Sequence, residues 1–267
     1  MKHIIVGSGV IGKATGEWLI ANNYDVVFYD KNKKVLDSIK KEKRNVIYKL
    51  ENSVVDDTYN VFVWICTAEW NTEEALKETI EFQKQKKIGN VFYVIRSTTY
   101  PGTTENLREA YSVKFIAHNP EFLREKTAIN DMFNPDRVVI GTSQIKMEKI
   151  LKEFYEKNYT NIVCTDSTSS ELIKLASNCW LATQITYWNE IKKIADKLNL
   201  NPQEIANVCT LDKRISKYGT NMLGKPFSGF CLPKDTKALD KLFLDNKINS
   251  DLLHLIIKLN EESVNEK

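Results

Sequence analysis

The 267-residue chain has few of the residues that build metal sites and disulfide frameworks. It contains three histidines, widely separated, and no C-x-x-C pair. Its cysteines are odd in number and scattered: Cys66, Cys164, Cys179, Cys209 and Cys231. Such a set argues against a disulfide framework, and so few histidines argue against a zinc site. We therefore expect a reduced protein without a metal.

Long apolar runs and a strong charge of one sign are also lacking. No stretch is apolar over the length that a membrane span needs, and the chain opens on the strand-like MKHIIVG without a signal-peptide pattern. The net charge is +3, with lysines spread along the chain, which does not favour a nucleic-acid partner. We expect a soluble, cytoplasmic protein that binds neither membrane nor nucleic acid.

The sequence does contain a clear change of pattern near residue 166. Before it, β-rich runs at 3–7, 25–30, 45–50, 60–67, 90–98, 113–120, 136–142 and 161–166 alternate with helical stretches such as 12–23, 71–87 and 144–158. After it, 167–199 has helical periodicity with neither Gly nor Pro, and Ser167 to Ser170 offer several N-caps. The pattern predicts an α/β protein: a Rossmann, doubly wound, mostly parallel sheet at 1–166, then an all-helical domain led by one long helix at 167–267.

The stretch IIVGSGVIGKATG carries Gly7, Gly9 and Gly12 at the spacing G-x-G-x-x-G, directly after a strand and opening a helix. Gly7 would allow the tight turn, Gly9 the approach of a pyrophosphate, and Gly12 the packing of helix on strand. Asp30 ends the second strand, where a carboxylate would hold the ribose hydroxyls and favour NAD over NADP. The alternative is a Rossmann-like fold with a nucleotide-free crevice.

Polar residues recur at helical spacing in the second half. Glu171, Lys174 and Asn178 share one face of the long helix, for which a solvated face is the usual explanation. Glu121 and Glu125 would lie one helical turn apart after a strand, and such carboxylates repel unless something positive compensates.

The stretch GFCLPKDTKAL at 229–239 places a lone thiol at the start of a helix. Pro233 suits the first helical position, and the positive helix end would favour a thiolate at Cys231. Asp235, four residues on, would face the same direction. A buried cysteine that acts as a small hydrophobic residue is the simpler interpretation of these residues alone.

Five stretches, in order, resemble the UDP-glucose/GDP-mannose dehydrogenase family of NAD-dependent nucleotide-sugar dehydrogenases. They are GSGVIG with Asp30, RSTTYPGTT at 96–104, NPEFLREKTAINDMFNPDRVVIG at 119–141, ELIKLASNCWLATQITYWNEI at 171–191 and GFCLPKDTKAL at 229–239. The resemblance implies oxidation of a sugar 6-hydroxyl to a uronic acid with two NAD+ in succession. It also implies a homodimer; the long helix with Trp180, Tyr187 and Trp188 is a candidate seam.

The resemblance assigns the chemical roles. Cys231 matches the nucleophile, whose thiolate adds to the aldehyde carbon. The adduct then gives up a hydride and becomes a thioester, which is hydrolysed. Lys174 and Asn178 match the residues that steady the oxyanion, and Asp235 matches one that positions or activates water.

Further positions follow from the same resemblance. Glu121 and Glu125 match a pair with one member near the sugar and one assisting proton transfer through water, and Thr98 matches a threonine close to the nicotinamide and the catalytic water. Arg214 matches an arginine that reaches the sugar of the neighbouring subunit. The implied cofactor contacts are Gly7, Gly9, Val10, Ile11, Gly12, Asp30, Lys34, Thr67, Thr98 and Glu125, and the implied substrate contacts are Glu121, Phe122, Leu123, Lys174, Asn178, Arg214 and Gly229.

The chain also departs from the family pattern. The family's lead-in to the cysteine resembles F-G-G-x-C, whereas this chain has Phe227-Ser-Gly-Phe-Cys231, and Ala68 replaces a usual proline. Family members usually continue into a third domain that grips the nucleotide, which we expect to be absent here or supplied by a separate partner. Three functions stay open: an active nucleotide-sugar dehydrogenase, a non-catalytic NAD-binding or dimer-forming subunit, and a two-domain hydroxyacid-type dehydrogenase, which has no use for Cys231.

Overall fold

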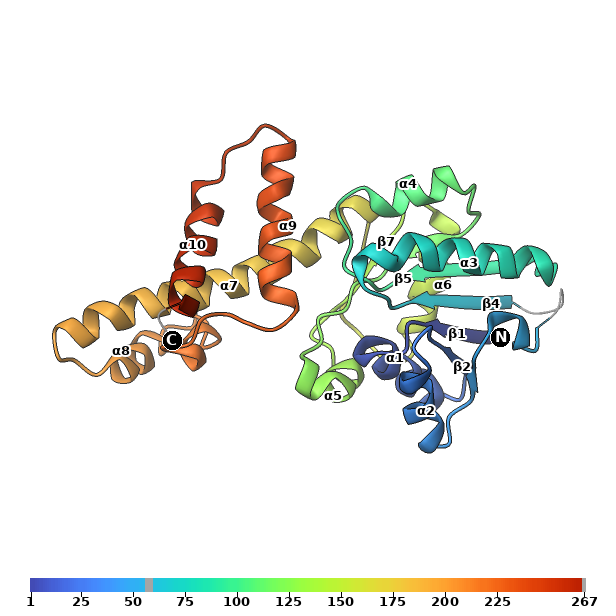
Figure 1. The fold of residues 1–267 in the computed structure, drawn as a ribbon, viewed down its shortest axis with the longest axis horizontal. Coiled ribbons are helices and arrows are strands. Elements are labelled where there is room, and N and C mark those ends of the chain that lie inside the picture. Colours follow the sequence, from blue (N-terminus) through green and yellow to red (C-terminus); the bar gives the residue numbers. More distant parts are fainter. Residues whose placement is uncertain (56–59, 266–267) are drawn as a thin grey trace. The chain divides into compact units, whose positions relative to one another are not determined.

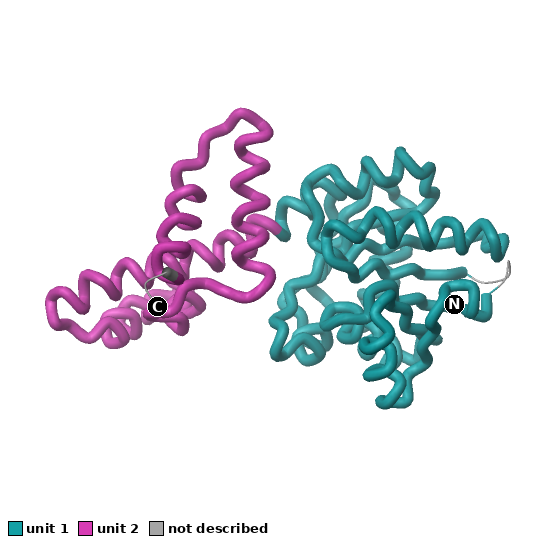
Figure 2. Tube along the Cα trace, in the orientation of Figure 1, with its two compact units in different colours: residues 1–174 teal, residues 175–267 magenta. Residues whose placement is uncertain are grey.

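The computed structural model describes residues 1–55 and 60–265. By its internal contacts the chain divides into two units, Met1–Lys174 and Leu175–Lys267 (Figure 2). The division falls inside one long helix, so that the first turns of this helix belong to the first unit and the rest to the second.

The first unit is built on an eight-stranded sheet of order β3-β2-β1-β4-β5-β6-β7-β8. The strands are β1 (Lys2–Val6), β2 (Asp25–Tyr29), β3 (Val46–Ile47), β4 (Asn60–Ile65), β5 (Asn90–Ile95), β6 (Ile116–His118), β7 (Val138–Gly141) and β8 (Ile162–Thr165). Every neighbouring pair is parallel except β6 with β7. The predicted Rossmann-like, mostly parallel sheet is confirmed, and the strand order reverses direction between β1 and β4.

Helices cover both faces of this sheet (Figure 1). One face packs on α1 (Val10–Ala21), α2 (Lys33–Lys41), α5 (Ala128–Phe133) and α6 (Ile145–Tyr155), and the other on α3 (Thr72–Gln85) and α4 (Thr103–Ala110). Successive strand residues alternate between the two cores: Phe62 and Trp64 face the α1 side, whereas Val61 and Val63 face α3. Because both faces are buried, these strands read as continuous apolar runs.

The second unit is helical. After α7 (Ser167–Lys197) come α8 (Pro202–Cys209), α9 (Cys231–Asp245) and α10 (Asp251–Asn265), which confirms the predicted helical region led by a long helix. Residues 266 and 267, the end of the predicted all-helical domain, lie outside the described residues. Among the described helices, none combines the length and the apolar character needed to cross a bilayer.

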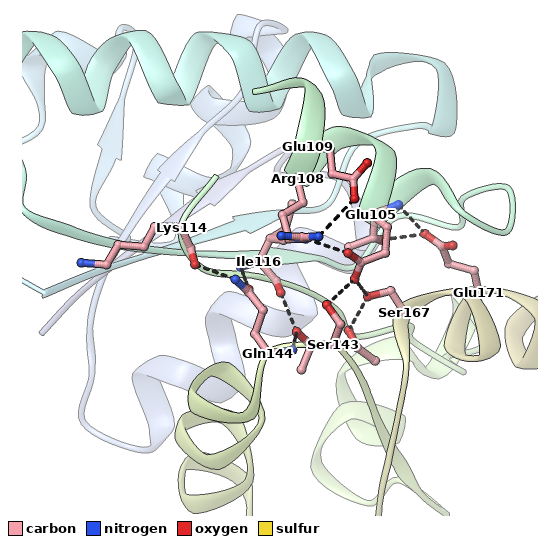
Figure 3. Close-up of polar contacts among 12 residues, drawn as sticks. Glu105, Arg108, Glu109, Lys114, Ile116, Ser143, Gln144, Ser167 and Glu171 are labelled. Atoms are coloured by element: carbon pink, nitrogen blue, oxygen red, sulfur yellow. Dashed lines mark hydrogen bonds and ion pairs between the residues drawn. The ribbon is translucent and has the colours of Figure 1, made fainter. Parts of the chain in front are cut away.

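The start of α7 is capped by Asp166 and not by the serines that we expected. The Asp166 carboxylate accepts hydrogen bonds from the Ser169 backbone N–H (2.8 Å) and the Ser169 hydroxyl (2.6 Å). The hydroxyl of Ser167 instead donates to Glu105 of α4 at 3.1 Å (Figure 3). Glu105 also accepts from Ser143, in the turn before α6, so this carboxylate ties α4, that turn and the start of α7 together.

Glu171 of α7 is hydrogen-bonded to the loop after β5 and to the start of α4. Its side chain is fully buried, and it accepts four hydrogen bonds: from the Thr99 hydroxyl (3.1 Å), the Gly102 N–H (2.6 Å), the Thr104 N–H (2.8 Å) and the Thr104 hydroxyl (2.6 Å). Burial raises the pKa of Glu171, and the bonds from Thr104, Gly102 and Thr99 oppose that rise. The carboxylate therefore acts as an internal anchor rather than as part of a solvated face.

We predict that Glu171→Ala lowers the free energy of unfolding of the first unit. Each buried donor left without an acceptor costs about 1–3 kcal/mol, and partial access of water should hold the total near 2–4 kcal/mol. Denaturant unfolding followed by far-UV circular dichroism measures the loss. The matched control is Glu153→Ala, whose side chain is 59% exposed on α6; a loss no larger than that of the control would contradict the anchoring role.

Candidate functional site

The glycine loop between β1 and α1 has the conformation that the spacing predicts. Gly7 has φ +87°, and a Cβ there would lie 2.8 Å from the Cys66 carbonyl. A Cβ on Gly12 would lie 1.9 Å from the Gly7 oxygen, so this position needs glycine for close packing. A Cβ on Gly9 would meet nothing within 4 Å, which leaves open space in front of the N-terminus of α1. This is where a phosphate group would be attracted by the first N–H groups of the helix.

Asp30 lies at the end of β2, directly beside this loop. Its carboxylate accepts from the Ser8 N–H (2.7 Å) and the Asn32 N–H (2.8 Å). A carboxylate has about four acceptor sites, so capacity for two hydroxyl groups remains. Of the neighbouring lysines, Lys31 pairs with Glu74 at 2.8 Å, whereas Lys34 is exposed in the first turn of α2. Lys31 therefore already has an anionic partner beside Asp30.

Two turns at the carboxyl ends of β4 and β5 complete the edge of the sheet. Thr67 follows β4, and within the described residues its buried hydroxyl has no hydrogen-bond partner. Ser97 follows β5 and donates to the Thr67 backbone oxygen at 2.7 Å, which joins the two turns. Thr98 is half-buried next to it. An unsatisfied buried hydroxyl at the point where the strand order reverses has hydrogen-bonding capacity left for a ligand at this edge.

Lys174 on α7 contacts Glu121 within the first unit. Its ammonium donates to the Glu121 backbone oxygen at 2.6 Å and lies 3.2 Å from the Glu121 carboxylate, and both side chains are buried. The ammonium also lies 5.3 Å from the centre of the Phe122 ring, and the Leu123 N–H donates to Glu121 at 2.7 Å. Glu121, Phe122 and Leu123 are thus held as a loop against α7.

The expectation that Glu121 and Glu125 lie one helical turn apart is wrong. Residues 119–124 form no helix, because Pro120 and the bonds of Glu121 to Lys174 and Leu123 hold this segment in another conformation. Glu125 begins a short 3-10 helix (Glu125–Thr127) and is exposed. The charge of Glu121 is compensated by the buried ammonium of Lys174.

In the second unit, Asn178 of α7 is hydrogen-bonded to Asp235 of α9. The Asn178 amide donates to the Asp235 carboxylate, which is fully buried and also paired with Lys234. Cys179 packs beside them, with its sulfur 3.5 Å from the Asp235 backbone oxygen. The buried positions of Lys174 and Asn178, one helical turn apart on α7, rule out the solvated-face interpretation.

Cys231 is the first residue of α9 and is exposed, so the interpretation as a buried core cysteine is wrong. Pro233 is the third helical residue and not the first, but it still lies among the positions whose N–H groups lack an intrahelical partner. Burial raises the pKa of Cys66 and Cys179 to about 12, which keeps both thiols protonated near neutral pH.

The remaining predicted positions are more dispersed. Val10 and Ile11 begin α1, with Val10 exposed. Gly229 has φ +81° in the exposed turn before α9. Arg214 is exposed after α8 and forms an ion pair with Asp212 at 2.6 Å; no contact of Arg214 with the other predicted site residues is found among the described residues.

Sequence reasoning missed His118 at the end of β6. This fully buried ring lies 2.9 Å from the Ser170 hydroxyl on α7 and 3.3 Å from the Ser97 backbone oxygen, and burial lowers its pKa to about 3. It therefore supports the same loop as Glu171, as a neutral group. In the sequence, the signal for a role of His118 was its place in His118-Asn119-Pro120, at the end of a predicted strand.

Both parts of the chain are similar to known proteins. Residues 66–159 match the NAD binding domain, and residues 168–262 the central domain, of the UDP-glucose/GDP-mannose dehydrogenase family. The UDP-glucose 6-dehydrogenase of Rickettsia bellii is 30% identical over 98% of this chain and 67% of its own length, and that of Campylobacter jejuni is 32% identical over 98% and 72%. The structure of a UDP-glucose dehydrogenase from Pyrobaculum islandicum superimposes with a TM-score of 0.85 at 26% identity, over 98% of this chain and 68% of that one.

These matches confirm the family resemblance and NAD as the cofactor. The chain spans about two thirds of the length of these relatives. The loop of Gly7, Gly9 and Gly12 precedes the matched 66–159, but its open space, Asp30 and the unsatisfied Thr67 hydroxyl fit a dinucleotide.

We predict that Gly9→Ala weakens NAD+ binding without unfolding the protein. The added methyl group meets no protein atom but fills the space in front of α1. Lost contacts of about 1.4–3 kcal/mol would raise the Kd for NAD+ about 10- to 100-fold, measured by titration calorimetry. Gly12→Ala is the contrasting variant, because its Cβ clash should lower the unfolding temperature as well. Unchanged affinity in Gly9→Ala would contradict the proposed phosphate position.

Proposed function

The chain belongs to the UDP-glucose/GDP-mannose dehydrogenase family, and from this membership we propose that it oxidises the 6-hydroxyl of a nucleotide sugar to the carboxylate. The proposed reaction takes four electrons and two NAD+ in succession, in the cytoplasm, with a UDP-glucose-like substrate. Each NAD+ supplies the chemistry of a hydride acceptor.

The observation that carries the proposal is the pair of contacts made by α7. Lys174 forms an ion pair with Glu121, and Asn178, one helical turn later, donates a hydrogen bond to Asp235. Asp235 lies in α9, which begins with the exposed Cys231. A buried ammonium and a buried amide on one helix face are donors suited to a developing oxyanion. An exposed thiol at a helix N-terminus is suited to nucleophilic attack, because the first N–H groups favour negative charge there.

In the first step of the proposed reaction, the alcohol gives up a hydride and a proton and becomes an aldehyde. The Cys231 thiolate then adds to the carbonyl carbon, and Lys174 and Asn178 donate to the oxygen of the resulting thiohemiacetal. Loss of a second hydride and a proton leaves a thioester. Water, oriented by Asp235 and Thr98, hydrolyses it to the carboxylate and releases the thiolate. Glu121 would lie near the sugar, and Glu125 would pass protons through water.

Two other functions make different demands on the same residues. A non-catalytic NAD-binding subunit would use the glycine loop and Asp30 but has no need of the buried Lys174 and Asp235. A hydroxyacid-type dehydrogenase could use Lys174 and Asn178 but not Cys231. The combination of these groups favours the nucleotide-sugar dehydrogenase.

We predict two NADH per sugar oxidised when the protein is given a panel of UDP- and GDP-sugars. The assay is run on the chain alone and with a separately expressed C-terminal domain of a relative, because that region is proposed to hold the nucleotide. Cys231→Ser should abolish release of the uronic acid, whereas Cys209→Ser, which changes another exposed thiol, should retain it. NADH absorbance and mass spectrometry of the product measure the stoichiometry.

Binding of NAD+ with no turnover of any nucleotide sugar, in either arm, would leave the non-catalytic subunit as the function. If Cys231→Ser forms uronic acid as fast as the wild type, the covalent mechanism is wrong, but the protein can still be a dehydrogenase.

We also propose that the chain forms a homodimer through α7, to which Arg214 would contribute across the subunits. In support, Trp180, Tyr187 and Ile194 follow one another at seven-residue spacing and are 61%, 57% and 53% exposed, which forms an apolar stripe on the helix. Trp188 is buried within its own unit and does not belong to the stripe.

Trp180→Glu should convert the dimer to a monomer in sedimentation velocity, since a charge in an apolar seam is costly to bury. The control is Trp70→Glu on the first unit, where the tryptophan is 67% exposed and lies outside the stripe. A wild-type protein that sediments as a monomer across the micromolar range would refute the dimer.

A further inference from the structure

We propose that Asn260 on α10 is a positioning residue for the nucleophile: it clamps the backbone of Phe227 and so fixes the start of the loop that carries Cys231. The inference rests on the proposed role of Cys231. It concerns a residue that lies twenty-nine positions further along the chain and in another helix.

The clamp consists of two hydrogen bonds between one side chain and one residue. The Phe227 N–H donates to Asn260 Oδ1 at 2.7 Å, and Asn260 Nδ2 donates to the Phe227 backbone oxygen at 3.0 Å. Phe227 and Asn260 are both buried, with 3% and 9% of their surfaces exposed. A side-chain amide carries its acceptor oxygen and its donor nitrogen side by side, which suits the N–H and C=O of one backbone residue.

Apolar packing holds the same point from the other side. Phe227 lies in a small core with Ala182 and Ile185 of α7 and Ile256 of α10. Ile256 and Asn260 are one helical turn apart, so α10 offers an apolar and a polar contact on a single face. The clamp satisfies two backbone groups that would otherwise be buried without partners.

Phe227 is the last buried residue before the nucleophile. Ser228, Gly229 and Phe230 are all exposed, and Gly229 turns the chain with φ +81°. Helix α9 then begins at Cys231, after Phe230, which provides no side-chain cap. Phe227 on one side and the buried Asp235 on the other are the two fixed points that enclose the thiol. Release of the first would let the loop and the first turn of α9 fray, and the thiol would no longer stand at an ordered helix start.

The experiment compares three variants with the wild type: Asn260→Asp, which keeps an acceptor for the Phe227 N–H but loses the donor; Asn260→Leu, which loses both; and Glu262→Leu, an exposed control on α10. The readout is the rate at which iodoacetamide alkylates Cys231, measured by peptide mass spectrometry and divided by the rate at Cys209 in the same molecule. Cys209 is exposed at the end of α8 and serves as the internal reference. Folding is checked by circular dichroism, and kcat and KM for NAD+ are measured where turnover exists.

We expect the Cys231/Cys209 ratio to fall at least about threefold in Asn260→Leu and by a smaller factor in Asn260→Asp, with no change in Glu262→Leu, because loss of helix alignment lowers the thiolate fraction. Where the wild type turns over sugar, kcat should fall and KM for NAD+ should stay unchanged.

Folded Asn260 variants with the wild-type ratio would overturn the proposal. Failure of both variants to fold would also overturn it, in favour of a purely structural role. The alkylation ratio does not require sugar turnover, so an inactive wild type would count against the proposed function without deciding this inference.

Discussion

The buried carboxylate of Glu171 is the constraint on which the arrangement of the first unit depends. It lies in the first turns of α7 and receives four hydrogen bonds, two from the loop after β5 and two from Thr104 at the start of α4. Ser167 and Ser170, which both precede this anchor on α7, contact Glu105 and His118 respectively. Lys174 lies three residues after Glu171 on the same helix, so fixing Glu171 also sets the rotation and height of Lys174. This is how α7 presents Lys174 to Glu121.

The same helix supplies polar groups to both units at intervals of one turn. Glu171 and Lys174 complete contacts of the first unit, and Asn178 completes one of the second. Burying an ammonium, an amide and carboxylates is costly unless each is paired, and here each is. These paired polar groups are fixed donors and acceptors, which is what the proposed reaction at a carbonyl would require.

Much of the fold could be predicted from local pattern. The strands are continuous apolar runs because helices cover both faces, and the glycine spacing predicted the loop because a Cβ at Gly7 or Gly12 would collide with backbone. Errors arose where a tertiary contact replaced a local preference. Glu121 is not helical, because Lys174 donates a hydrogen bond to its backbone oxygen. Asp166 and not a serine caps α7, because Ser167 and Ser170 form hydrogen bonds with Glu105 and His118.

By itself the sequence determined the elements, the dinucleotide loop and the identity of the polar residues, because these depend on periodicity, backbone freedom and the chemistry of single side chains. Only the tertiary structure decided that Glu171, Lys174 and Asn178 are buried and which residues they contact. The helical spacing in the sequence is the same whether that face is exposed to water or covered by protein. It also brought Asn260 to Phe227, thirty-three residues away, which no local pattern encodes.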